Sequence, residues 1–342
     1  MIDFSLTEEQ RAVRQTAREF AEEEVEPVAR EHEESGEWPE AVWEAAVDAD
    51  LVGIGIPTKY GGAGMGQVEG TIFAEEVARA DAGMLAAIGT SFGTRMIAEY
   101  GSEAQKEWIL EGVATGELIG ALGNTEPEHG SDAASIETSA RRDGDEFVVD
   151  GVKTFITHGA IADYVLTTCR TGEPGHGGIS AIIVETDRDG FSVESEIHKM
   201  GWNASNTAQL RYDGVRVPAT NLVGTEDEGF YQLMAFFEEE RVGIAAQALG
   251  IAQRCLDEAV DYVGRREQFG RPIGEFQAVR HTVADMAVKV ENARRLTYDA
   301  AARIDRGEEP TKLASMAKLY ASEVAEEVAS DAMQLHGGNG YT

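Results

Sequence analysis

The sequence predicts an α+β multidomain protein with an N-terminal helical domain, a middle β-barrel domain and an incomplete C-terminal helical bundle. Apolar residues recur at steps of three or four in the first and last thirds of the chain, which is the spacing of helices. Between them, short runs alternate polar and apolar residues, as strands with one buried face do. The predicted domains cover residues 1–118, 119–224 and 225–342.

The first domain is predicted to consist of helices. Thr7 is a suitable N-cap, because its hydroxyl can accept from free amides while Glu8 and Glu9 favour the positive end of the helix. The apolar side of this helix is predicted to contain Val13, Ala17, Phe20 and Ala21. A second helix should begin after Pro39, with an apolar side made of Val42, Trp43, Ala46 and Val47.

The middle domain is predicted from short alternating runs that are separated by turn sequences. Asp-Gly pairs occur at 143–144, 150–151, 189–190 and 213–214, and such pairs are typical of hairpins. The clearest strands lie at 164–166, 179–184 and 209–212. A barrel-like arrangement would cover the edges of so many short strands.

The last domain begins with a long helix that is predicted to end near Gly264. Its apolar stripe is predicted to contain Leu233, Phe237, Ile244, Ala248, Ile251 and Cys255. Further helices are expected at 275–305 and 311–335, the last one stopped by Gly337 and Gly338. Three antiparallel helices form an incomplete bundle.

The composition excludes several classes of partner. Sixty-two acidic residues against 29 basic residues give a formal charge of −33, which argues against nucleic acid and anionic membrane surfaces. We interpret the acidic excess as a surface hydrated against high salt, as in a halophilic cytosol. Cys169 and Cys255 are too few and too far apart for a disulfide framework or a metal site. No apolar run is long enough to span a membrane, so a cytoplasmic location is expected.

The stretch 120–159 contains the strongest functional signal. Its first block is Thr125-Glu126-Pro127 followed by Gly130-Ser131-Asp132, and its second block is Phe155-Ile156-Thr157-His158-Gly159. Glycines and hydroxyls suit a loop whose backbone lies against a ligand. These blocks resemble the acyl-CoA dehydrogenase flavoproteins, and the resemblance continues through 266–270, 276–277 and 334–340, so it covers nearly the whole chain.

The resemblance implies FAD as the cofactor, held by two groups of residues. The first group lies in the middle domain and comprises Leu122, Thr125, Gly130, Ser131, Phe155, Ile156 and Thr157. The second group would reach the flavin of a neighbouring subunit and comprises Arg266, Gln268, Phe269, Gln277, Gln334, Gly337 and Gly338. It implies a homo-oligomer, a dimer of dimers by family habit.

The resemblance also implies the substrate and the reaction. An acyl-CoA would be bound through Ser131 and Arg241 and oxidised to the trans-2-enoyl thioester, as in fatty acid metabolism, with an electron-transferring flavoprotein as acceptor. This chain departs from the family at Glu128-His129, where small residues are common. Because an acid repels phosphate, these side chains are expected to turn to solvent or to an arginine.

The catalytic base is expected to be Glu240. Most family members carry it in a carboxy-terminal segment beyond the equivalent of Thr342, but a minority place it directly before an arginine on the long helix, as in Glu240-Arg241. Helix arithmetic puts Glu240 on the predicted stripe and Glu239 about 100° away. A desolvated carboxyl has a raised pKa, which suits a base. The alternatives are a base outside this chain, or no base and an acidic surface run at 238–240.

Two other functions remain open on the same fold. A flavin monooxygenase would lack a base and would react its reduced flavin with oxygen, and Glu240-Arg241 favours the dehydrogenase over it. A catalytically impaired FAD- or CoA-binding chain is the third possibility. The residues do not indicate the acyl chain length.

Overall fold

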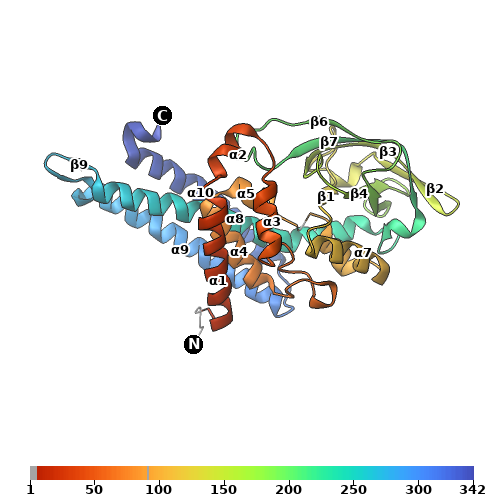
Figure 1. Cartoon of the computed structure of the whole chain (residues 1–342), viewed down its shortest axis with the longest axis horizontal. Coiled ribbons are helices and arrows are strands. Elements are labelled where there is room, and N and C mark those ends of the chain that lie inside the picture. Colours follow the sequence, from red (N-terminus) through yellow and green to blue (C-terminus); the bar gives the residue numbers. More distant parts are fainter. Residues whose placement is uncertain (1–5, 91) are drawn as a thin grey trace. The chain divides into compact units, whose positions relative to one another are not determined.

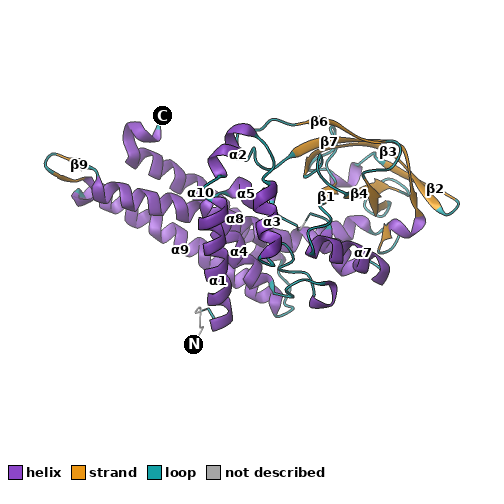
Figure 2. Ribbon diagram, in the orientation of Figure 1, coloured by secondary structure: helices purple, strands orange, loops and turns teal. Residues whose placement is uncertain are grey.

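The computed structural model describes residues 6–90 and 92–342. Helices form its first and last parts and strands its middle part, with one small hairpin among the later helices (Figures 1 and 2). The predicted fold class is confirmed. The first helices are α1 (Glu8–Phe20), which continues into a π-helical turn (Ala21–Val25), α2 (Ala29–Ser35), α3 (Glu40–Asp48), α4 (Gln67–Ala80), α5 (Ala82–Ala87), α6 (Thr94–Tyr100) and α7 (Glu103–Ala114).

The start of α1 follows the local rules that predicted it. The Thr7 hydroxyl accepts from the amide of Gln10, and the Gln10 side chain accepts from the amide of Thr7, which makes a reciprocal capping box. The predicted apolar side is also confirmed. Val13, Ala17, Phe20 and Ala21 are all buried.

An eight-stranded mixed sheet forms the middle of the chain. Its order is β6-β7-β3-β2-β4-β5-β8, and β1 pairs in parallel with β4. Buried side chains from most of these strands, Phe147, Ile182 and Leu210 among them, make one apolar core. The strands are β1 (Gly120–Gly123), β2 (Ser139–Asp143), β3 (Glu146–Thr157), β4 (Tyr164–Arg170), β5 (Ile179–Glu185), β6 (Phe191–Glu196), β7 (Thr207–Pro218) and β8 (Leu222–Val223).

The last part of the chain returns to helix. The long helix α8 (Gly229–Arg265) ends one residue beyond the predicted position, and a hairpin of β9 (Glu267–Gln268) and β10 (Arg271–Pro272) follows it. The helices α9 (Gln277–Asp305) and α10 (Thr311–His336) agree with the predicted ranges and pack against each other. Gly337 follows α10 with φ of 60°, a left-handed conformation that glycine adopts without strain.

Contacts divide the chain into two units. One unit contains residues 1–29, 66–85 and 238–342, and the other contains residues 30–65 and 86–237. The first unit is helical and includes α1, α4, α9, α10 and most of α8. The second unit contains the whole eight-stranded sheet together with α3, α6 and α7.

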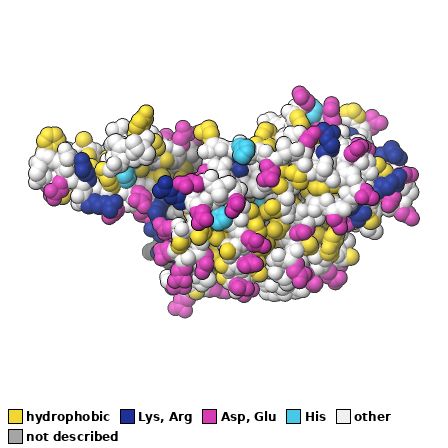
Figure 3. Space-filling view, turned by 45° about the horizontal axis from the view of Figure 1, so that its top comes forward, with side chains coloured by type: hydrophobic (Ala, Val, Ile, Leu, Met, Phe, Trp, Pro, Cys, Tyr) yellow, Lys and Arg dark blue, Asp and Glu magenta, His cyan; other side chains and the backbone are white. Residues whose placement is uncertain are grey.

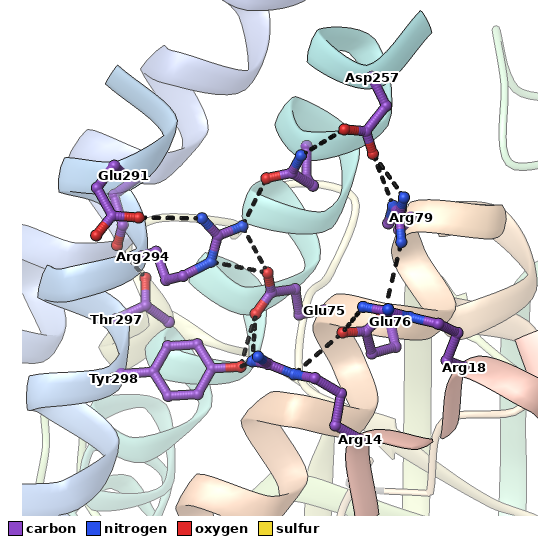
Figure 4. Close-up of polar contacts among 12 residues, drawn as sticks. Arg14, Arg18, Glu75, Glu76, Arg79, Asp257, Glu291, Arg294, Thr297 and Tyr298 are labelled. Atoms are coloured by element: carbon purple, nitrogen blue, oxygen red, sulfur yellow. Dashed lines mark hydrogen bonds and ion pairs between the residues drawn. The ribbon is translucent and has the colours of Figure 1, made fainter. Parts of the chain in front are cut away.

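A buried polar network joins the helices of the first unit (Figure 4). Glu75 and Glu76 of α4 are buried, and arginines from α1, α4 and α9 converge on them. Oε1 of Glu75 accepts from Nε and Nη2 of Arg294 at 3.0 and 2.8 Å, and Oε2 accepts from the Tyr298 hydroxyl at 2.6 Å. The network borders a cavity of about 370 Å³, lined by Arg14, Arg18, Glu75, Glu76, Arg79, Gln253 and Arg294.

The network extends outward through further ion pairs. Arg14, Arg18, Arg79 and Arg294 face Glu75, Glu76, Asp257 and Glu291. Glu291 also pairs with Arg295 at 2.8 Å, so every carboxylate of the network has an arginine partner. We conclude that the network fixes the helices to one another, since a buried charge is tolerated only when it is paired.

Acidic side chains are spread over the face seen in Figure 3, with basic ones fewer among them. This distribution agrees with the formal charge of −33. None of the helices in the described residues combines the length and the apolar character that crossing a membrane requires.

Candidate functional site

The first group of predicted residues lies on β1, on the loop that follows it and on β3, all within the sheet-containing unit. The loop is joined to β3 by a backbone hydrogen bond from the amide of Thr154 to the carbonyl of Thr125 at 2.8 Å. The structure therefore brings Thr125 next to the strand that carries Phe155, Ile156 and Thr157. Residues 30 positions apart in the sequence share one surface.

Two hydroxyls on this surface remain available to a ligand. Thr125 and Thr157 are both half-buried. Their side chains make no hydrogen bond to any residue in the described part of the chain, while their backbones are held by Thr154 and by the β7 ladder. A partly buried hydroxyl on a fixed backbone is suited to hydrogen-bonding a bound heterocycle.

Phe155 lies on β3, two residues before Thr157. Its side chain is 65% exposed, and its backbone φ is 59°, a left-handed value that is unfavourable for a bulky residue. The cause is a β-bulge, because Lys153 pairs with Leu210 and Ile156 with Ala208, which leaves one extra residue on β3. A bulge that presents a strained aromatic side chain suggests a role in ligand binding.

The other residues of this group differ in accessibility. Leu122 is half-buried on β1, and Gly130 and Ser131 are exposed in the loop. Ile156 is 2% exposed and its side chain belongs to the sheet core, so only its backbone is available to a ligand. The sequence predicted Ile156 as a cofactor contact but did not indicate whether its side chain or its backbone makes that contact.

The structure shows where Glu128 and His129, which replace the small residues common in the family, direct their side chains. Glu128 is exposed, as predicted for a side chain turned to solvent. His129 does not turn to an arginine; its Nε2 lies 3.7 Å from the carboxylate of Glu137. Backbone hydrogen bonds between Glu126 and His129 close a turn that positions both side chains.

Sequence reasoning missed a buried ion pair beneath this surface. The Nζ of Lys153 lies 2.9 Å from Oε1 of Glu126, and both side chains are buried. Burial opposes ionisation of Glu126, but the charge of Lys153 and two backbone amides outweigh it and hold the pKa of the carboxyl below its usual value. A lysine amid apolar strand residues was the available signal, because such a lysine requires a buried partner.

His158 was also missed as a structural residue. It is buried, with Nε2 at 3.0 Å from the carbonyl of Ala87 and Nδ1 at 3.3 Å from that of Gly120. Burial lowers the pKa of His158, although the two carbonyl groups oppose this effect. The ring therefore connects the end of β3 to the start of β1 and to the end of α5.

Glu240 and Arg241 lie on α8 in the other unit. Both are partly buried, and the side chain of Arg241 makes no hydrogen bond or ion pair with another residue of the described chain. The predicted stripe is only partly correct. Leu233 and Ala248 are buried, but Ile244, one turn after Glu240, is 40% exposed, because the helix buries instead the face of Val242, Ala245, Ala246, Leu249 and Ala252. Glu240 therefore faces outward from the buried side of α8.

The second group of predicted residues begins at the hairpin after α8. Gln268 pairs with Arg271, so Phe269 and Gly270 form a two-residue turn in which both φ angles are positive, at 55° and 79°. Phe269 is 94% exposed at its tip, and Arg266 and Gln268 are exposed beside it. Gln277 is exposed at the start of α9. Such a hairpin offers an aromatic side chain and a guanidinium to a partner.

The carboxy-terminal motif lies next to the base of this hairpin. The ring of His336 stacks on Tyr262 at 4.3 Å, and the Asn339 side chain donates to the Tyr262 hydroxyl at 3.1 Å. The amide of Arg266 in turn donates to the carbonyl of Tyr262. Tyr262 thus joins the two halves of the group, and Gln334, Gly337 and Gly338 are all exposed there. Sequence reasoning missed Tyr262.

The first surface fits a flat aromatic cofactor. It offers an exposed aromatic ring, two hydroxyls that bond to none of the described residues, and glycine-containing backbone in the adjoining loop. None of the described His, Cys, Asp and Glu side chains gather into a candidate metal site.

Three models of one protein family match the chain. They describe the N-terminal domain of acyl-CoA dehydrogenases at residues 7–117, the middle domain at 121–215 and the C-terminal domain at 227–342. The domain boundaries at 118 and 224 stay predictions, because the two contact-based units divide the chain differently.

Curated relatives and solved structures agree with the family models. An acyl-CoA dehydrogenase of Bacillus subtilis is 42% identical over 98% of this chain and 89% of its own length. A short-chain-specific acyl-CoA dehydrogenase of Clostridium acetobutylicum is 41% identical over 100% of this chain and 91% of its own. The solved butyryl-CoA dehydrogenase of Megasphaera elsdenii superposes with a TM-score of 0.97 at 36% identity, covering 100% of this chain and 91% of that one.

Proposed function

The chain belongs to the acyl-CoA dehydrogenase family, whose members are FAD-dependent oxidoreductases, and on that premise we propose how it works. It removes two hydrogens from an acyl-CoA thioester and forms the trans-2-enoyl thioester. The observation that carries the proposal is the surface formed by the loop after β1 and by β3, where the hydroxyls of Thr125 and Thr157 have no partner among the described residues and Phe155 has an exposed ring.

In this proposal the two threonines and Phe155 hold the isoalloxazine ring. The two hydroxyls would hydrogen-bond its polar atoms, and the phenyl ring would pack against it. Ser131 and Gly130 provide hydroxyl and amide donors for the pyrophosphate, where an exposed loop with glycine allows close approach of the backbone. Leu122 and the backbone of Ile156 complete the set of residues that contact FAD.

The reaction is divided between the cofactor and one carboxylate. Glu240 takes the proton from the carbon α to the thioester carbonyl, which requires the ionised carboxylate. FAD held by Thr125, Thr157 and Phe155 would supply the acceptor for the hydride of the β carbon. The electron pair of the α C–H bond becomes the new double bond, so the product gains no net charge. Arg241 binds an anionic part of CoA, for which its guanidinium has no competing partner in the described chain.

In this proposal the second group of residues acts at the interface between subunits. Arg266, Gln268, Phe269, Gln277, Gln334, Gly337 and Gly338 contact the FAD of a neighbouring subunit in a dimer of dimers. The support is the exposure of the hairpin tip and of the carboxy-terminal motif beside it. An electron-transferring flavoprotein as acceptor, a cytoplasmic location and a role in fatty acid metabolism complete the proposal.

An anaerobic titration tests the function. Purified protein is loaded with FAD and mixed with saturated acyl-CoAs of graded length, and the visible flavin absorption is followed. Rapid bleaching without oxygen uptake is expected. Bleaching only with a reduced pyridine nucleotide, followed by oxygen uptake, would favour a monooxygenase. Protein that stays colourless after loading with FAD would favour the third possibility, a non-catalytic chain.

A further inference from the structure

The carbonyl and carboxylate groups on either side of Thr125 are held by a single buried ammonium group. Lys153, on β3, is 0% exposed. Its Nζ donates to the backbone carbonyl of Asn124 at 2.9 Å and to Oε1 of Glu126 at 2.9 Å. These acceptors belong to the residue before Thr125 and the residue after it.

Further contacts fix Thr125 and Glu126. The Glu126 carboxylate also accepts from the amides of Glu137 and Thr138 at 2.7 and 2.8 Å, which anchors it to the segment before β2. The carbonyl of Thr125 accepts from Thr154, as described above. The backbone of the loop is therefore held on both sides of Thr125, whereas the Thr125 hydroxyl is left for a ligand.

Stability alone does not explain a charged residue at position 153. Taking an ammonium and a carboxylate out of water costs several kcal/mol per ion, and a well-packed apolar pair is often equally stable. An apolar residue could not bind the Asn124 carbonyl, however. The ammonium has three donors at one point, and two of them hold groups that lie two residues apart.

We infer that Lys153 is a positioning residue for the cofactor, acting through Asn124 and Glu126 to hold the Thr125 hydroxyl where it meets the flavin ring. This inference rests on the proposed function. It assigns a role to a residue that does not itself touch the cofactor. The prediction is that losing the ammonium disturbs cofactor binding even when the charge of its partner is also removed.

Two variants distinguish the positioning role of Lys153 from its role as a counter-charge to Glu126. Lys153→Met removes the donors and leaves the Glu126 carboxylate buried without its counter-charge. The double variant Lys153→Met/Glu126→Gln is neutral at both positions, so the stability of the apoprotein should recover, but it still lacks the donor to Asn124. Arg216→Gln is the matched control, because it breaks an exposed ion pair with Asp143 and Glu146 on the same sheet.

The measurements are the FAD dissociation constant of each apoprotein, from flavin fluorescence, the visible spectrum of the bound flavin, and urea unfolding. We expect both Lys153 variants to bind FAD at least about tenfold more weakly, the effect of losing one charge-assisted hydrogen bond, and to show shifted flavin bands. The Arg216→Gln protein should bind FAD as the wild type does.

Two results would overturn the inference alone. One is wild-type FAD affinity in Lys153→Met. The other is full recovery of FAD affinity together with stability in the double variant, which would reduce Lys153 to a counter-charge. Wild-type protein that binds no FAD would instead overturn the proposed function and this inference with it.

Discussion

The amide of Thr154 donates a hydrogen bond to the carbonyl of Thr125 at 2.8 Å and thereby joins the loop after β1 to the bulged part of β3. One side of this junction carries a threonine hydroxyl and the other carries Phe155 and Thr157. The bond explains how two sequence blocks separated by β2 and most of β3 form one surface. The predictions below test this surface, the base and the packing of the helical unit.

Replacing Glu240 should remove the proton acceptor. Glu240→Gln is expected to slow anaerobic flavin bleaching by acyl-CoA by a factor of about 10² to 10⁴, the usual contribution of a general base, with FAD affinity unchanged. Stopped-flow absorbance measures the rate. Glu239→Gln is the control and should bleach normally. Bleaching that survives intact in Glu240→Gln would place the base elsewhere.

Replacing Phe155 should weaken FAD binding with little effect on the fold. In Phe155→Gly, relief of the left-handed backbone contributes about 1–2 kcal/mol, and the extra chain entropy of glycine opposes it by about 0.5–1 kcal/mol. The free energy of unfolding of the apoprotein, from urea denaturation, should therefore change by only about 1 kcal/mol.

The affinity measurement completes the Phe155 test. FAD titration should show clear weakening in Phe155→Gly and near-normal binding in Phe155→Trp, because a larger aromatic ring still stacks. Val193→Ala removes another exposed apolar side chain of the sheet and serves as control. Equal FAD affinity in Phe155→Gly and wild type would show that the ring does not contact the cofactor.

The Glu126 carboxyl should contribute to stability in a pH-dependent way. Its pKa in the folded protein lies below the ordinary value of 4.5, so its contribution is complete above that pH and is lost as the pH falls through the folded pKa. Glu126→Gln should be less stable by about 3–5 kcal/mol near neutral pH, as for breaking a buried ion pair from one side. Urea unfolding at several pH values should show this difference shrinking below pH 4.5. A difference that is constant with pH would contradict the assignment.

The Glu75 network should be important for the stability of the helical unit. Glu75→Gln removes the closer of the two carboxylate partners of the partly buried Arg294 guanidinium and leaves Glu291 at 3.4 Å (Figure 4). A loss of about 3–5 kcal/mol is expected, as for breaking a buried ion pair from one side. Asp261→Asn breaks the exposed pair with Arg265 and should change the unfolding free energy little. Similar effects of the two substitutions would mean that the network does not stabilise the fold.

The acidic surface should make stability depend on salt. Repulsion within a chain of formal charge −33 is screened as the Debye length falls from about 30 Å at 0.01 M to about 3 Å at 1 M ionic strength. The thermal unfolding midpoint should rise over this range in potassium chloride. An unchanged thermal unfolding midpoint would contradict the interpretation that the surface is adapted to high salt.

Local signals in the sequence predicted much of the fold. The capping residues at Thr7, the Asp-Gly turn at Gly144 and the alternating residues of β3 act through neighbours a few positions away, so they can be recognised without the tertiary structure. The predicted face of α8 failed at Ile244 for the opposite reason. Helical spacing shows which residues share a face, but the packing partners determine which face is buried.

By itself, the sequence determined the order of helical and strand regions, the acidic character of the surface and the two blocks around Thr125 and Thr157. The tertiary structure alone decided that Lys153 reaches Glu126, that His158 meets the carbonyl of Ala87, and that arginines from α1, α4 and α9 enclose Glu75 and Glu76. The physical reason is distance along the chain. A buried charge requires a partner, but only the folded backbone determines which of 62 acidic and 29 basic residues come within reach of one another.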